Sequence, residues 1–477
     1  MHSFPNFNGK FHIFRQKRKV FLVSVRHRRT DAFLNKDFRE KLNFFSFSDI
    51  DSGRKDRIMK FTSTEATPAP HVPPGVPRLT GAAKEDIPMY RIQTMNKISP
   101  VGLNRFPSEL YEVGDAVQDP QGILVRSAKL LDLEFNPGLL AIARAGVGVN
   151  NIPLDRCAAA GIPVFSTPGA NANAVKELVI CAMLMGSRDI PGAIRWVREQ
   201  AASGVDVSTV VEKGKSAFIG PELYKKTLGI IGLGAIGSIV ANTAISLGMD
   251  VYGYDPFLSV DTALRLDRHV HVVKDINDLY KRSDYITMHI HYTEKTAHMI
   301  DASAIAAMKR GVRVINLARG EIVDDEAMLT ALDTGMVAAY ITDFPNNRLL
   351  TAPHVIAMPH LGASTPESEQ NCAAMAVDTL RDYLESGNIR SSVNLPEMTM
   401  DRSGVQRLCV LHKNVPGMLA NITSLFGRDG VNVENLSNKS RGDYAYTMVD
   451  LGSKVGDNVI EDVRRTANVI RVRSLEW

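Results

Sequence analysis

Three glycines with the spacing G-x-G-x-x-G follow an apolar run near the middle of the chain. Gly232, Gly234 and Gly237 come directly after Thr227–Ile231. In this pattern the first glycine permits a tight turn, the second lets the backbone approach a pyrophosphate, and the third allows a helix to pack closely on the strand. The free N–H groups and positive dipole end of such a helix suit an anion without a basic side chain. The spacing therefore predicts a phosphate-binding strand–turn–helix.

An acidic residue at the end of the next apolar run extends this prediction to a whole dinucleotide. Val251–Tyr254 leads into Asp255, eighteen residues after Gly237. A carboxylate at this place can bind both hydroxyls of a ribose. Residues 256–258 (Pro-Phe-Leu) offer no cation for a 2′-phosphate, so the sequence favours NAD over NADP. The alternative interpretation is a surface turn with a capping acid.

Two later segments carry side chains that could act on a substrate. They are Ile315–Gly320 (I-N-L-A-R-G) and Pro359–Thr365 (P-H-L-G-A-S-T). With the glycine-rich turn, they resemble the D-isomer-specific 2-hydroxyacid dehydrogenase family, and the resemblance covers residues 90–477. It implies that Arg319 binds the substrate carboxylate and polarises the keto oxygen, as paired guanidinium donors can. It also implies that His360 is the acid/base that removes the hydroxyl proton during hydride transfer.

The sequence departs from the family pattern close to this histidine. Most members carry a glutamate that pairs with the histidine, whereas Asn347 stands at that position. Aligned on Phe344, the family's aspartate falls on Thr342, and Asp343 lies one residue later. A one-residue step turns a strand side chain to the other face, so either residue could meet the nicotinamide. The cofactor-binding residues that the resemblance implies are Gly232, Gly234, Ala235, Ile236, Gly237, Asp255, Leu317, Asp343 and Gly362.

Segments near the start of the resemblance are similar to family loops that meet the substrate. They are Gly122–Ala128 and Ala143–Val149. Two arginines in them, Arg126 and Arg144, would suit a substrate that carries a phosphate as well as a carboxylate. As isolated residues, both are more often solvated. The substrate-binding residues that the resemblance implies are Arg126, Ser127, Arg144 and Asn171.

The last part of the chain predicts a separate module. Residues 405–477 predict the order strand, helix, two strands, helix and strand. Within them, Leu411–Leu419 resembles the ACT regulatory domain. In that family paired domains bind serine at their interface, through residues that match His412, Asn414 and Asn432. Imidazole and amide groups suit an amino acid, although both asparagines could be ordinary turn residues.

The elements that must position these residues alternate between strand and helix candidates from Tyr90 onward. This alternation predicts parallel α/β sheets. The predicted fold class is α/β, with two doubly wound parallel-sheet domains, one for substrate and a Rossmann domain for NAD, plus a C-terminal β-α-β-β-α-β ACT domain. The predicted domains are a disordered or targeting extension (1–88), a substrate-binding domain (89–170 and 363–395), an NAD-binding domain (171–362) and an ACT regulatory domain (405–477).

Composition excludes several classes of protein. The 44% hydrophobic and 23% charged residues are typical of a globular protein, and 477 residues exceed one hydrophobic core. Of the 56 Lys and Arg residues, eight lie in residues 1–30, so the net charge of +4 does not indicate a nucleic-acid surface. No apolar run is long enough to predict a membrane span. The four cysteines are scattered, which favours a reducing compartment and predicts no metal site.

The N-terminal extension leaves the location open. Its first thirty residues are Arg-rich and free of acids. This fits a transit peptide, but a disordered extension, or an upstream translated stretch before a start at Met59, fits equally well. The predicted location is cytoplasmic, or plastid or mitochondrial if residues 1–60 are a transit peptide.

The resemblance implies a specific activity. It is the NAD-dependent oxidation of 3-phosphoglycerate to 3-phosphohydroxypyruvate, the first step of phosphorylated serine biosynthesis, in a homodimer or homotetramer inhibited by serine. A relative acting on glyoxylate or hydroxypyruvate is one alternative. An NAD-sensing interaction protein on the same fold is another, since Asn347 replaces the expected glutamate.

Overall fold

The computed structural model describes residues 10–16, 19–25 and 89–477. The chain divides into two units after Ala82, and each is described by itself. In the first unit, strands β1 (Lys10–Gln16) and β2 (Lys19–Val25) form an antiparallel pair that the sequence did not predict. The rest of the predicted targeting extension, including Met59, lies outside the described residues.

A five-stranded parallel sheet begins the second unit, and its strand order is β4-β3-β5-β6-β7. The long helix α12 (Pro366–Ser386) returns to this sheet from much later in the chain. It buries Val377 and Leu380 in one core with Ile92 and Leu124. The other elements are β3 (Tyr90–Met95), α2 (Pro100–Leu103), β4 (Tyr111–Gly114), β5 (Gly122–Val125), β6 (Ala141–Arg144), α3 (Leu154–Ala159) and β7 (Val164–Phe165).

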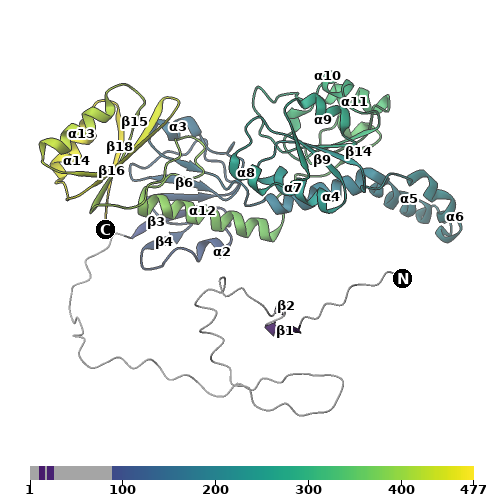
Figure 1. Ribbon diagram of the computed structural model, residues 1–477, viewed down its shortest axis with the longest axis horizontal. Helices are drawn as coiled ribbons and strands as arrows, with labels where there is room; N and C mark the ends of the chain where they lie inside the picture. Colours follow the sequence, from purple (N-terminus) through teal and green to yellow (C-terminus); the bar gives the residue numbers. More distant parts are fainter. Residues whose placement is uncertain (1–9, 17–18, 26–88) are drawn as a thin grey trace, which may run out of the picture. The chain divides into compact units, whose positions relative to one another are not determined.

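A seven-stranded parallel sheet follows, with the order β10-β9-β8-β11-β12-β13-β14. Helices cover both of its faces and bury two separate cores (Figure 1). The order reverses between β8 and β11, which places a ligand crevice at the carboxyl ends of these strands. The strands are β8 (Thr227–Ile231), β9 (Asp250–Tyr254), β10 (Val270–Val273), β11 (Tyr285–Met288), β12 (Val312–Asn316), β13 (Val337–Thr342) and β14 (Val355–Ala357). The helices are α4 (Ala172–Arg188), α7 (Ala235–Ser246), α8 (Val260–Arg265), α9 (Ile276–Arg282), α10 (Ala302–Ala306) and α11 (Asp325–Asp333), with short 3-10 turns η2 (Gly320–Ile322) and η3 (Leu349–Thr351).

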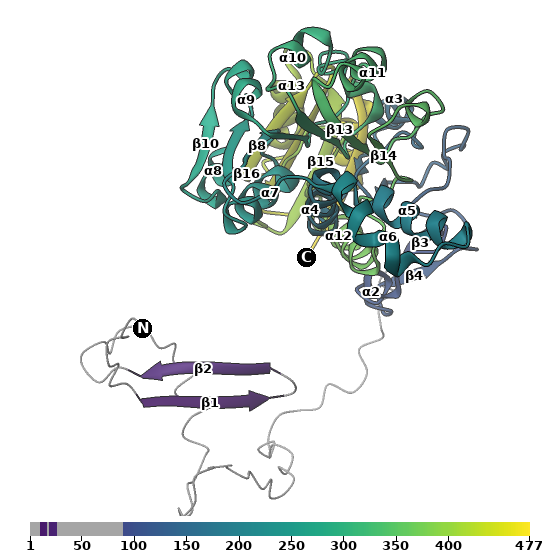
Figure 2. The same cartoon turned by 90° about the vertical axis from the view of Figure 1, so that its right-hand side faces the viewer.

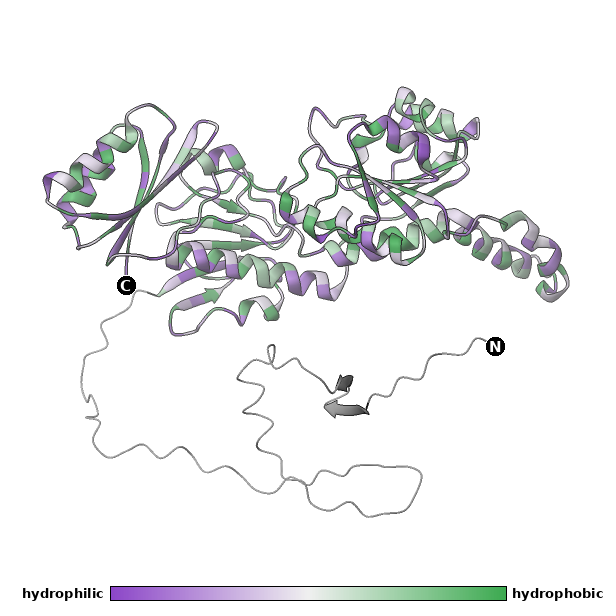
Figure 3. Ribbon diagram, viewed as in Figure 1, coloured by the Kyte–Doolittle hydropathy of each residue, from purple (hydrophilic) through white to green (hydrophobic). Residues whose placement is uncertain are grey.

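Two helices extend from this domain as an arm, α5 (Ile190–Ala202) and α6 (Val207–Gly214), followed by the 3-10 turn η1 (Lys215–Phe218). Figure 2 shows the same arm nearly end-on. Neither helix buries a residue, and apolar side chains such as Ile194 are exposed on it. Figure 3 shows hydrophobic and hydrophilic residues mixed along the arm. The sequence analysis did not predict the arm.

The C-terminal module has the predicted element order and forms an antiparallel sheet, β16-β17-β15-β18. Helices α13 and α14 cover one face of it. The other face buries Leu411 and Tyr446 in one core with Tyr383 and Leu384 of α12. Both faces are therefore covered within one chain. The elements are β15 (Gln406–Lys413), α13 (Met418–Arg428), β16 (Val433–Arg441), β17 (Tyr444–Leu451), α14 (Asp457–Arg465) and β18 (Val469–Glu476).

The segment between α12 and this module is packed, although its Pro- and Ser-containing sequence predicts a linker. Leu395, Met398 and Met400 in it are buried in the shared core. An antiparallel bridge also joins Met398 to Ile389. Apolar side chains brought together by the fold thus join the module to the first sheet.

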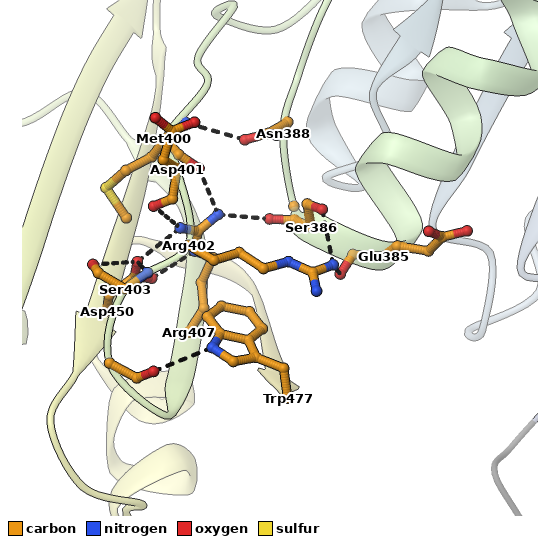
Figure 4. A network of polar contacts seen from close by, with 12 residues as sticks. Glu385, Ser386, Asn388, Met400, Asp401, Arg402, Ser403, Arg407, Asp450 and Trp477 are labelled. Carbon is orange, nitrogen blue, oxygen red and sulfur yellow. Dashed lines mark hydrogen bonds and ion pairs between the residues drawn. The ribbon is translucent and has the colours of Figure 1, made fainter. Parts of the chain in front are cut away.

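A buried ion pair lies at this junction. Arg407 and Asp450 have no exposed side-chain surface, and Nε and Nη2 of Arg407 lie 2.5 and 2.7 Å from the carboxylate oxygens. Nη1 of Arg407 also donates to the carbonyl oxygen of Ser386, at 2.9 Å. Arg402 donates to the carbonyl oxygen of Glu385, at 2.8 Å (Figure 4).

A third arginine binds the same helix end. Arg473 donates to the carbonyl oxygens of Tyr383, at 3.1 Å, and Leu384, at 2.8 Å. The last four carbonyls of a helix have no partner within it. Guanidinium groups of the C-terminal module therefore satisfy the end of α12 and hold the module against it.

In the part of the chain that the structure describes, no helix has both the length and the apolar content that a membrane crossing requires.

Candidate active site

The glycine-rich turn has the backbone geometry that its spacing predicts. Gly232 has φ +89°, and a Cβ there would lie 2.6 Å from the carbonyl oxygen of His289. A Cβ on Gly237 would lie 1.9 Å from the carbonyl oxygen of Gly232. By contrast, no atom lies within 4 Å of the Cβ position of Gly234. Two glycines are thus required by packing, and the third faces space that a phosphate could fill.

Helix α7 starts at this space. Gly234 is its N-cap and supplies no side-chain acceptor, and both Gly234 and Ala235 are exposed. The N–H groups of the first turn, which includes Ile236, are therefore free to bind an anion. The residues present fit the pyrophosphate of a dinucleotide.

Asp255 lies at the end of β9, next to the same turn. Its Oδ2 accepts a hydrogen bond from the N–H of Leu233, and its Oδ1 accepts one from the N–H of Phe257, both at 2.9 Å. These bonds fix the half-buried carboxylate, and each oxygen keeps a second lone pair that can accept a ribose hydroxyl.

Arg319 and His360 both lie at the carboxyl end of the seven-stranded sheet, because they follow β12 and β14 respectively. The ring of Phe344 lies between them. Its centroid is 5.9 Å from Cζ of Arg319 and 4.7 Å from the centroid of the exposed His360 ring. The structure therefore brings both implied catalytic residues onto one aromatic side chain, a contact that sequence reasoning missed.

Asp343 and Thr342 differ in what they reach. Asp343 is 1% exposed, and its Oδ2 accepts the N–H of Gly362 at 3.2 Å, while its Oδ1 is buried without a partner. The hydroxyl of Thr342 instead accepts the N–H of Phe344 at 3.0 Å. Asp343 therefore contacts the His360 loop and keeps a free acceptor. Burial raises the pKa of Asp343, and the N–H of Gly362 and the nearby His360 oppose that rise.

Asp343→Asn should stabilise the protein at neutral pH while impairing any cofactor contact of this side chain. A carboxyl whose pKa is raised by folding favours the folded state at low pH and disfavours it once the pH passes the folded pKa. Asparagine carries no charge at any pH. The gain in stability should therefore vanish below about pH 4, where Asp343 is protonated in both the folded and the unfolded chain. Melting temperatures measured as a function of pH test this. A constant difference between variant and parent would contradict it.

Leu317, another implied cofactor contact, is buried. It packs with Ile315 and Ile341 under the carboxyl end of the sheet. Within the described residues, no group of three or more His, Cys, Asp or Glu side chains is arranged to hold a metal ion.

Arg126 and Arg144, which follow strands of the five-stranded sheet or end them, lie near Arg319 of the seven-stranded sheet. Guanidinium nitrogens of Arg144 and Arg319 each lie 3.0 Å from the Cβ position of Gly148. Nε of Arg144 donates to the carbonyl oxygen of Arg126 at 2.9 Å. Burial lowers the pKa of Arg144, and the neighbouring positive charges of Arg319 and Arg126 lower it further. A bound anion would relieve this repulsion, so the arrangement favours an anionic substrate.

The loops around these arginines have their own supports. The N–H groups of Ser127 and Ala128 donate to Oδ1 of Asn96, at 3.1 and 2.6 Å. Asn96 was missed by sequence reasoning, although a polar residue directly after strand β3 was a usable signal. Asn171 precedes α4, and its Oδ1 is buried without a partner, so this side chain can accept a hydrogen bond from a ligand.

The three residues implied to bind serine lie in different environments. His412 is 2% exposed, and its ring nitrogens lie 2.8 Å from the carbonyl oxygen of Lys413 and 2.9 Å from the hydroxyl of Thr447. Asn414 and Asn432 are exposed.

The strand register separates these two asparagines. Asn414 adjoins Lys413, which pairs with Tyr444 at one end of β17. Asn432 adjoins Val433, which pairs with Leu451 at the other end of β17. The strand rise puts them on the order of 20 Å apart, so one chain does not bring them together.

Comparison with known proteins gives consistent similarities. Residues 180–362 match the family described as D-isomer specific 2-hydroxyacid dehydrogenase, NAD binding domain. The chain is 31% identical over 379 residues to D-3-phosphoglycerate dehydrogenase of Haemophilus influenzae, covering 76% of this chain and 88% of that protein. It is 36% identical over 326 residues to the protein of that name from Synechocystis, covering 66% of this chain but spanning only 56% of the relative's length.

A solved structure is also similar. It is NAD-bound 3-phosphoglycerate dehydrogenase of Entamoeba histolytica, with 26% identity and a TM-score of 0.51. The match covers 64% of this chain and 99% of that chain.

Proposed function

Because the chain belongs to the D-isomer specific 2-hydroxyacid dehydrogenase family, we propose that it oxidises D-3-phosphoglycerate to 3-phosphohydroxypyruvate with NAD. The convergence of Arg126, Arg144 and Arg319 beside His360 carries this proposal. A substrate with a carboxylate at one end and a phosphate at the other would neutralise such a cluster. A single carboxylate, as in glyoxylate or lactate, would leave at least one of these guanidinium groups without an anion from the substrate.

The chain's own residues divide the work at the reacting carbon. The first turn of α7 and Asp255 would hold NAD, which when bound would accept the hydride that leaves C2. Arg319 binds the carboxylate and stabilises the charge that builds on the adjacent oxygen. His360 removes the hydroxyl proton as the carbonyl forms and returns it in the reverse direction. Asn171 offers its free oxygen to a substrate hydroxyl.

The C-terminal module would make the enzyme responsive to serine. Asn414 and Asn432 lie at opposite ends of the sheet, so an amino acid that touches both must sit between two copies of the chain. Serine would then inhibit by binding one arrangement of the subunits more tightly than another. Inhibition by serine would suit an enzyme at the start of phosphorylated serine synthesis.

A homodimer or homotetramer fits both this pairing and the arm. Apolar side chains on or beside α5 and α6, among them Ile194, Val197 and Val211, are exposed in the single chain. A second copy could cover them. Sedimentation equilibrium with and without serine tests the assembly, and a monomer at all concentrations would contradict it.

A spectrophotometric assay of NADH formation by the full chain tests the activity. D-3-phosphoglycerate should be oxidised far faster than D-glycerate or D-lactate, and serine should slow the reaction. Faster reduction of glyoxylate or hydroxypyruvate than of 3-phosphohydroxypyruvate would favour the related reductases instead. A protein that binds NADH and turns over none of these compounds would favour an NAD sensor.

Asn347→Glu should restore the carboxylate that the family places near the histidine. Asn347 is exposed in the loop that begins at Phe344, the residue in contact with His360. A negative charge there stabilises the imidazolium form, so the apparent pKa of the kcat/KM profile for oxidation should rise by about one unit. Asn347→Gln adds the same length without charge and should leave the profile in place. An unshifted profile for the glutamate variant would show that another group already fills the role.

A further inference from the structure

One carboxylate lies among the three substrate arginines. Glu369, in the first turn of α12, accepts a hydrogen bond from Nη2 of Arg126 at 2.6 Å. The side chain of Arg126 is 42% exposed and that of Glu369 is 44% exposed. Within residues 89–477, Arg144 and Arg319 form no such ion pair, so one of the three cations is already neutralised.

We propose that Glu369 is an internal competitor for Arg126, which the phosphate of a substrate must displace. This inference rests on the proposed function for the identity of the substrate. An ion pair this exposed contributes little to stability, so breaking it costs little. A phosphate carries a charge of about −1.5 to −2 and three strong acceptor oxygens, and it therefore outcompetes a single carboxylate for a guanidinium.

Glu369 has a second favourable interaction that makes the exchange feasible. It lies in the first helical turn, after Thr365, whose hydroxyl caps α12. A negative charge at this end is stabilised by the helix dipole when Arg126 leaves. Glu369 can therefore stay ionised beside the site, where it repels any anion bound to Arg126.

The consequence is that a ligand needs a second anionic group to bind tightly. Inorganic phosphate must displace Glu369 with no other contact to assist it. A ligand whose carboxylate is already held by Arg319 presents its phosphate to Arg126 at a high effective concentration. Glu369 thus lowers the affinity of free phosphate and of the longer substrate by a similar factor, and only the ligand with a second contact at Arg319 still binds tightly.

Titration calorimetry with inorganic phosphate tests this on the full chain. Glu369→Gln keeps an oxygen that can accept from Arg126 but removes the charge, so its Kd for phosphate should fall by about two- to fivefold. Two control variants should leave this Kd unchanged. Glu367→Gln removes a charge from the same helical turn, and Asp378→Asn removes a comparable exposed pair on α12, in which Asp378 lies 2.6 Å from Arg105.

Kinetics give a second readout that separates the two proposals. In Glu369→Gln the KM for D-3-phosphoglycerate should fall by a similar factor of about two to five, while the KM for D-glycerate stays the same.

If the protein does not oxidise phosphoglycerate but the variant still binds phosphate more tightly, the proposed function fails and the competitor role stands. Weaker phosphate binding in both Glu369→Gln and Glu369→Ala would show that Glu369 instead holds Arg126 in place, and would overturn the inference. An unchanged Kd in both variants would also overturn it.

Discussion

His360→Asn should lower kcat for the oxidation by about a hundred- to ten-thousandfold, the usual loss on removal of a general acid/base. Asparagine retains hydrogen-bonding groups but does not exchange a proton near neutral pH. The ring of His360 contacts Phe344 at the carboxyl edge of the sheet, after β14, and the glycine-rich turn follows β8, four strands away. NADH binding, measured by fluorescence, should therefore be nearly unchanged, and the loss should appear in kcat rather than in KM.

His354→Asn is the matched control for this variant. His354 is exposed, and it has φ +63°, a backbone conformation that asparagine adopts readily. The same substitution six residues earlier should leave kcat unchanged. A kcat of His360→Asn within about threefold of the parent would be a much smaller loss than removal of a general base causes. Another residue would then have to move the proton.

Arg407→Met should destabilise the C-terminal module by about 3–5 kcal/mol, because it leaves the buried charge of Asp450 without a counterion. Asp450 would keep the N–H and hydroxyl of Ser403, both at 2.9 Å, but no positive charge. The carbonyl oxygen of Ser386 at the end of α12 would lose its donor as well. The substitution thus weakens both the module and its attachment to the first sheet.

Tryptophan fluorescence can report this loss locally. Trp477 lies over the guanidinium groups of Arg402 and Arg407, with 4.9 and 5.3 Å between each Cζ and the ring centroid. In a Trp196→Phe background its emission follows urea denaturation of the junction alone. The double variant Arg407→Met, Asp450→Leu should recover part of the loss, because no charge then stays buried. If Arg407→Met alone were as stable as the parent, the ion pair would contribute nothing to the stability of the module.

Features that depend on neighbours in sequence could be predicted well. Gly232 and Gly237 are dictated by a turn and a helix contact within a few residues, and the structure has the expected backbone there. The strand–helix alternation gave both parallel sheets, and the order of the C-terminal elements was also confirmed. The strands β3, β4 and β10 were missed, because each is short and partly exposed and so shows little apolar pattern.

Features that depend on distant segments could not be predicted in the same way. Residues 391–404 have a linker's composition, yet Met398 and Met400 are buried there because α12 and β17 supply an apolar surface. The arm α5–α6 was also missed, and within residues 89–477 neither of its helices buries a residue.

The sequence by itself determined the dinucleotide turn, the fold class and the family, because local backbone geometry and hydrophobic period are properties of neighbouring residues. Only the tertiary structure decided which charges meet. Asp343 rather than Thr342 reaches the His360 loop, and Arg126 is paired with Glu369, 243 positions away along the chain. His412 is buried, and Asn414 and Asn432 lie at opposite ends of one sheet. Such contacts follow from how whole layers pack, which no short stretch of sequence contains.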